Sequence, residues 1–155
     1  LKPGGKWSNE RVIIFTEYRA TQNWLQEVMA VEGFTDGDRL LTMYGGMDPE
    51  KREEVKAAFQ TSPEASPVRI LLATDAASEG LDFQNFCHRL IHYEIPWNPN
   101  RMEQRNGRVD RHGQKSDQVL VYTSSARVTA SGPGVSLANT SPIWMPIWSS
   151  SCGWR

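Results

Sequence analysis

Cysteine is scarce in this chain of 155 residues, which contains only Cys87 and Cys152. Two cysteines provide neither a disulfide framework nor a zinc site, and they fit a reducing compartment. No apolar run approaches the roughly 18 residues that a membrane-spanning helix needs, and no basic-then-apolar leader indicates secretion. We therefore expect a cytoplasmic protein without a membrane anchor. Because the first residue is Leu1 and not Met, we expect a fragment of a longer protein.

An excess of charge of one sign is also lacking, since the formal net charge is −1. This balance excludes a histone-like polycation but allows a local basic patch. Charge almost disappears after residue 118, where only Arg127 and Arg155 remain. That part is rich in Ser, Thr, Gly and Pro and has neither helical nor alternating periodicity. We predict that residues 124–155 form a disordered or non-native tail, with an aromatic docking peptide as the alternative.

Up to residue 123, short apolar runs alternate with segments of helical character. Strands are predicted at 11–16, 40–43, 68–73, 90–93 and 119–122. Helices are predicted at about 18–31, from Asp48 to the Pro/Ser loop at 61–67, and at about 100–109. Buried strands separated by helices predict an α/β fold, a three-layer domain in which helices flank a parallel sheet. We expect this domain to span residues 11–123, after an N-terminal linker at 1–10.

Binding residues of parallel sheets lie in the loops beyond the carboxyl ends of the strands. One such loop, residues 74–82, carries side chains suited to a nucleotide. The hydroxyl of Thr74 suits a phosphate oxygen, Gly80 allows close backbone approach, and Asp82 can accept hydrogen bonds from a ribose. The same residue types are common in ordinary turns and caps, so this loop alone does not decide between nucleotide binding and an ordinary structural turn.

Arginine is concentrated between residues 101 and 114. The four arginines are Arg101, Arg105, Arg108 and Arg111. The first three share a helical face, and each guanidinium is a permanently charged fork that matches the oxygens of a phosphate or of a phosphoryl group in transfer. The alternative is a solvated helix face that is screened by neighbouring carboxylates.

Five motifs follow one another in a fixed order within the predicted domain. They are Val-Ile-Ile-Phe-Thr at 12–16, Tyr-Gly-Gly-Met at 44–47 followed by Arg52, the segment 74–82, Ile-Pro-Trp-Asn-Pro at 95–99 and the segment 104–114. In this order they resemble motifs of the C-terminal (second) RecA-like lobe of superfamily-two helicases and ATPases. The resemblance is closest to the Swi/Snf type, and particularly to bacterial members similar to the RNA-polymerase-recycling ATPase and to phage-defence helicase-like proteins.

The resemblance implies a RecA-like fold and a role for each motif. Arg108 and Arg111 would be arginine fingers that reach the γ-phosphate of ATP. The nucleotide edge would include Gly80, Asp82, Gln104 and Arg105. The phosphate backbone of nucleic acid, expected to be double-stranded DNA, would be contacted by Thr16 and the loop after it, Gly45, Gly46, Arg52 and Thr74. ATP and Mg²⁺ would be held mainly by the N-terminal RecA-like lobe.

The phosphate-binding Gly-x-x-x-x-Gly-Lys-Ser/Thr motif and an Asp-Glu metal-binding motif do not occur in the sequence. Phosphoryl transfer needs these parts as well as the arginines. We therefore expect this chain to be part of an ATP-hydrolysing helicase or translocase and to be inactive alone. The alternative is a non-catalytic nucleic-acid-binding or protein-docking module that retains the fold.

Two tryptophans have predictable environments. Trp24 falls at helical spacing with Leu25, Val28 and Met29, which predicts packing in the core. Trp97 lies between two prolines, where it either packs beneath the segment 104–114 or offers a stacking platform. The first of these two interpretations of Trp97 is favoured.

Overall fold

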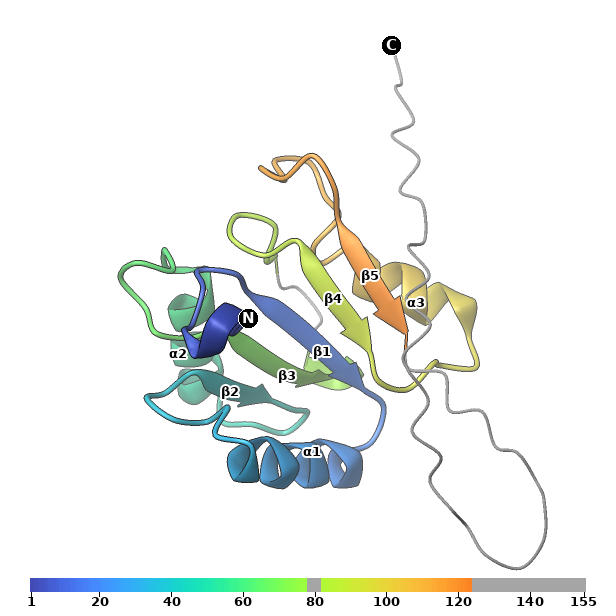
Figure 1. The fold of residues 1–155 in the computed structure, drawn as a ribbon. Helices are drawn as coiled ribbons and strands as arrows, with labels where there is room; N and C mark the ends of the chain where they lie inside the picture. The colour runs from blue at the N-terminus through green and yellow to red at the C-terminus, as the bar shows by residue number, and fades with distance from the viewer. Residues whose placement is uncertain (78–81, 124–155) are drawn as a thin grey trace, which may run out of the picture.

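A five-stranded parallel sheet forms the centre of the structure, a computed structural model that describes residues 1–77 and 82–123 (Figure 1). The strands are β1 (Val12–Thr16), β2 (Leu40–Met43), β3 (Ile70–Thr74), β4 (Arg89–His92) and β5 (Leu120–Thr123). They are ordered β2-β3-β1-β4-β5, and every neighbouring pair is parallel. The predicted α/β fold with a parallel sheet is confirmed, and each strand lies within two residues of its expected position. The tail at 124–155 is outside the described residues.

Proline and a capping side chain begin two of the three α-helices. The helices are α1 (Arg19–Val31), α2 (Pro49–Gln60) and α3 (Pro99–Asn106), with short 3-10 turns η1 (Pro3–Gly5) and η2 (Asp75–Ala77). Asp48 caps α2 by accepting hydrogen bonds from the amides of Glu50 and Lys51, and Asn98 caps α3 in the same way. The chain after α3 continues as turns, so this helix is shorter than predicted. Within the described residues, no helix is long and apolar enough to cross a bilayer.

Hydrophobic side chains alternate between the two faces of the sheet and build a core on each. On one face, Ile13, Phe15 and Leu71 pack with Phe59 of α2. On the other face, Val12, Ile14 and Leu72 pack with Leu25 of α1. The sheet is therefore the middle of three layers, as predicted, with α1 on one face and α2 on the other (Figure 1).

The environment of Trp24 differs from the prediction. Leu25 is buried and Met29 packs against the core, whereas Trp24 is 52% exposed and its ring lies 6.3 Å from that of Tyr93. The expectation that Trp24 belongs to the core is wrong, because the buried stripe of α1 runs through Gln22, Leu25 and Met29.

The first ten residues, predicted to be a linker, contact the domain in the structure. Trp7 packs edge-on against Phe34, and both belong to the core on the α1 side. Arg69 donates a hydrogen bond to the carbonyl oxygen of Ser8 over 2.7 Å. This segment is thereby held against the amino edge of the sheet.

Candidate functional site

The carboxyl ends of β1, β2 and β3 bring together most of the residues predicted to bind nucleic acid. Thr16 and Thr74 are paired across the sheet, and Gly45 follows β2. A Cβ atom at Gly45 would lie only 2.8 Å from the Cβ of Ala76, so the turn after β2 packs tightly on η2. The positive φ of Gly46, 79°, explains glycine at the next position of this turn.

The two threonines at this edge do not present their hydroxyls to solvent. Thr16 and Thr74 are both buried, and Thr16 Oγ1 has no hydrogen-bond partner within the described residues. A phosphate approaching here would meet the backbone of the glycine turn before it met either hydroxyl. Arg52 lies just beyond this turn, in the first half of α2, and is partly buried.

Gln22 joins α1 to this edge. Its buried side chain donates two hydrogen bonds, to the carbonyl oxygen of Met43 over 2.9 Å and to that of Leu72 over 2.6 Å. A buried amide that bridges β2, β3 and α1 fixes the position of the helix relative to the strand ends. A glutamine on the apolar stripe of α1 is the sequence signal for this role.

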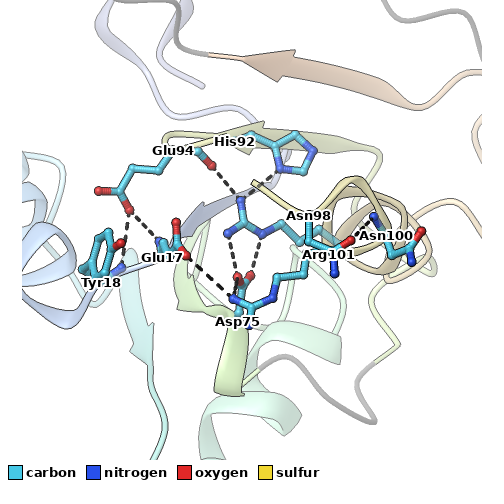
Figure 2. Close-up of polar contacts among 9 residues, drawn as sticks. Glu17, Tyr18, Asp75, His92, Glu94, Asn98, Asn100 and Arg101 are labelled. Carbon is cyan, nitrogen blue, oxygen red and sulfur yellow. Dashed lines mark hydrogen bonds and ion pairs between the residues drawn. The ribbon is translucent and has the colours of Figure 1, made fainter. Parts of the chain in front are cut away.

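Arg105 is the centre of a buried polar network, and Figure 2 shows its partners Asp75, His92 and Glu94. The side chain is only 1% exposed, and its Nε and Nη2 atoms lie 2.5 and 2.9 Å from the two carboxylate oxygens of Asp75. Its Nη1 atom donates to the carbonyl oxygen of Glu94 over 2.8 Å. The side chain of Arg105 therefore joins η2, α3 and the loop after β4 from an interior position.

The Glu94 side chain extends the network to α1. Its carboxylate accepts hydrogen bonds from the amides of Glu17 and Tyr18, over 2.6 and 3.4 Å, and from Thr21 Oγ1 over 2.7 Å. These donors surround the amino end of α1, where a negative charge is stabilised by the helix dipole.

His92 is buried beside Arg105, where its surroundings disfavour the charged form. Its Nε2 atom lies 2.9 Å from Asn106 Oδ1, and its Nδ1 atom lies 3.3 Å from Arg105 Nη1. Burial lowers the pKa of His92, the hydrogen bond that its Nε2 atom donates to Asn106 Oδ1 raises it, the charge of Arg105 lowers it and the charge of Asp75 raises it, with a net shift downward. The neutral ring can accept from Arg105 at Nδ1, and protonation would place two cations in contact.

We expect His92 to make folding stability depend on pH. Because its folded pKa is below the usual value of 6.5, the unfolded chain binds the proton first as the pH falls. The free energy of unfolding should therefore decrease below about pH 6.5, by at most about 1.4 kcal/mol per pH unit from this group. Urea unfolding at pH 7.5, 6.5 and 5.5 measures the slope. It should flatten in His92→Gln and persist in His112→Gln, and equal slopes in the two variants would contradict the assignment.

A polar pocket of about 320 Å³ opens beside this network. It is lined by Glu17, Asp75, Ala76, Arg101, Gln104, Arg105 and Arg108. The guanidinium of Arg101, to which the sequence interpretation assigned no role, lies 3.7 Å from the carboxylates of both Glu17 and Asp75. Gln104 and Arg108, two predicted site residues, thus share one pocket with carboxylates that the prediction did not include.

Arg108 and Arg111 both lie against the chain segment that begins at Asp82. The amide of Phe83 donates to the carbonyl oxygen of Arg108 over 2.9 Å, and the side chains of Arg111 and Asp82 form an ion pair. Arg108 Nε is buried and donates no hydrogen bond within the described residues. The structure therefore brings both arginines next to Asp82, whereas Gly80 is outside the described residues.

Trp97 projects completely from the loop after β4, with 100% of its surface exposed. The favoured interpretation, that Trp97 packs beneath the segment 104–114, is therefore wrong. Pro96, directly before Trp97, is buried instead. An exposed indole is the arrangement that the stacking alternative requires.

The chain matches the family described as "Helicase conserved C-terminal domain" over residues 6–113. It belongs to this family. Membership of this family explains the order of the motifs. The use of ATP is a general expectation for the family.

Relatives of this domain confirm the Swi/Snf-type resemblance. The chain is 39% identical over 121 residues to "Uncharacterized ATP-dependent helicase YqhH" of Bacillus subtilis, covering 78% of this chain and 20% of that protein. It is 33% identical over 109 residues to RNA polymerase-associated protein RapA of Proteus mirabilis, covering 70% and 11%. The chain thus spans a fifth or less of the length of these relatives.

A solved structure supports the RecA-like fold of the helicase C-terminal domain. The C-terminal part of the Fun30 ATPase domain superposes with a TM-score of 0.63 at 20% identity, covering 74% of this chain and 34% of that one.

Several residues of the site were missed by sequence reasoning. They are Glu17, Gln22, Asp75, His92, Glu94 and Arg101. Asp75 directly follows Thr74 at a strand end, and Glu94 is the only acidic residue between Asp82 and Glu103, so weak signals existed. Within the described residues, no group of three or more His, Cys, Asp or Glu side chains is arranged to hold a metal ion.

Proposed function

We propose that this domain is the second RecA-like lobe of an ATP-dependent translocase or helicase that acts on double-stranded DNA. In this proposal Arg108 and Arg111 face the γ-phosphate of ATP held by an N-terminal lobe, which also supplies the Mg²⁺ ligands. One observation carries the proposal: the half-buried Arg108, whose Nε has no partner among the described residues, lines the polar pocket, and Arg111 follows it on the same segment.

The residues present fit a phosphate group. Arg108 Nε has an unused hydrogen bond to donate, within the described residues, and a buried donor without an acceptor is unfavourable. The ion pair of Arg111 with Asp82 is about half exposed on both sides, so it contributes little to stability and is easily exchanged. ATP supplies the phosphoryl group when bound, and the two guanidinium groups stabilise its negative charge.

Nucleic acid is proposed to bind across the carboxyl edge. The Gly45–Gly46 turn offers backbone amides, Arg52 offers a positive charge behind it, and Trp97 offers an aromatic face. Contacts to phosphates carry little sequence information, so binding should depend on salt and not on base sequence.

We expect the chain to bind a fluorescein-labelled DNA duplex weakly, with an affinity that falls as salt rises. Trp97→Ala should weaken binding about tenfold, since burying this exposed indole against the duplex is worth about 1.5 kcal/mol. Anisotropy titrations at two salt concentrations and with two unrelated sequences provide the measurement. Trp24→Ala, which removes another exposed tryptophan, is the matched control. Salt-independent binding or a strong preference for one sequence would contradict the proposal.

A further inference from the structure

The loop that carries Trp97 is held on both sides of the indole. Glu94, two residues after β4, precedes Trp97 in the sequence, and Asn98, the N-cap of α3, follows it. Asn98 Oδ1 accepts from the amide of Asn100 over 3.0 Å, and the carbonyl oxygen of Asn98 accepts from the amide of Arg101 over 3.0 Å. Only three residues separate the two anchored positions.

Glu94 is anchored through both its side chain and its main chain (Figure 2). The carboxylate binds the amides of Glu17 and Tyr18 and the hydroxyl of Thr21, whereas the carbonyl oxygen accepts from the buried Arg105. A surface loop needs far less than this to remain closed. Glu94 therefore connects the loop to α1 through its carboxylate and to α3 through its carbonyl oxygen.

The loop between Glu94 and Asn98 has a restricted backbone and carries an exposed apolar side chain. Pro96 and Pro99 restrict the backbone around Trp97, whose ring is fully exposed. Because the backbone on both sides of Trp97 is already anchored, less conformational entropy is lost when the indole binds a partner.

We propose that Glu94 is a positioning residue that holds Trp97 in the orientation required for nucleic-acid binding. This inference rests on the proposed function, in which Trp97 contacts nucleic acid. Glu94 itself contacts no nucleic acid in this scheme and acts through the loop.

The sign of the change in DNA affinity distinguishes this proposal from a simple charge effect. Removing a negative charge favours binding to a polyanion, so Glu94→Gln or Glu94→Ala would bind DNA more tightly if charge alone mattered. Positioning predicts the opposite sign, because the loop loses its anchor on α1.

A double-mutant cycle tests this in the full chain with the labelled duplex. Glu94→Ala should weaken binding about five- to tenfold, but it should have no further effect when introduced into Trp97→Ala. Glu103→Ala, which removes an exposed carboxylate from α3, is the control and should not weaken binding. Tighter binding of Glu94→Ala, or an equal loss with and without Trp97, would overturn the proposal.

A second measurement needs no DNA. In protein labelled with 5-fluorotryptophan, the ¹⁹F line that disappears in Trp97→Phe belongs to Trp97. This line should shift or broaden in Glu94→Ala and not in Glu103→Ala, with Glu94→Gln replacing Glu94→Ala if the latter does not fold. An unchanged line would overturn the positioning role. If Trp97→Ala left the DNA affinity unchanged, the proposed DNA contact would fail, and the ¹⁹F line would still decide whether Glu94 positions Trp97.

Discussion

Replacing Arg108 or Arg111 by alanine in a two-lobe protein should lower kcat by about 10³-fold or more and leave the KM for ATP little changed. A guanidinium beside the γ-phosphate stabilises charge that develops mainly in the transition state, so its loss acts on the chemical step. The loss corresponds to about 4 kcal/mol of transition-state stabilisation. Lysine should not rescue either position, because an ammonium group lacks the planar fork.

A chimera allows the measurement. Residues 1–123 would replace the matching segment of the Bacillus subtilis relative, which is 39% identical to this chain, and steady-state ATP hydrolysis would be followed with and without duplex DNA. Arg39→Ala is the control, because Arg39 precedes β2 at the opposite edge of the sheet and stacks on Trp7. If Arg108→Ala and Arg111→Ala raised only KM, the two arginines would form a binding surface and not a pair of fingers.

Arg105→Met should destabilise the fold by about 3–5 kcal/mol, the cost of breaking a buried ion pair by removing one partner. The substitution keeps the length of the side chain but leaves the carboxylate of Asp75 and the carbonyl oxygen of Glu94 without their buried donor. Unsatisfied buried groups are responsible for most of this penalty.

Urea unfolding measures this effect, and Arg101→Met provides the matched control. Arg101 is 52% exposed and its two ion pairs are longer, at 3.7 Å, so its loss should cost no more than about 1 kcal/mol. Adding Asp75→Asn to Arg105→Met should recover part of the lost stability, because the carboxylate that has lost its Arg105 donor is then no longer charged. Similar losses in the Arg105 and Arg101 variants would show that the network of Arg105 is not the structural centre of the site.

The differences between Arg101 and Arg105 also show what could not be predicted from the sequence. Arg101, Arg105 and Arg108 share a helical face in the periodicity of the sequence, and nothing local distinguishes them. Burial depends on which turn of α3 meets β4 and η2, and that is set by packing between segments 13 to 30 residues apart. The helix that was expected to extend to residue 109 ends at Asn106, which places Arg108 in a turn beside Phe83.

The sequence by itself determined the layer architecture, the five strands and the family, because strand periodicity, proline-led helix starts and the order of short motifs are local properties of the chain. Only the tertiary structure decided that Thr16 and Thr74 are buried, that Arg105 pairs with Asp75 and that Trp97 is exposed. Burial and ion pairing are properties of contacts between distant segments. The same residue types are therefore compatible with an interior or a surface position until the sheet edge is assembled.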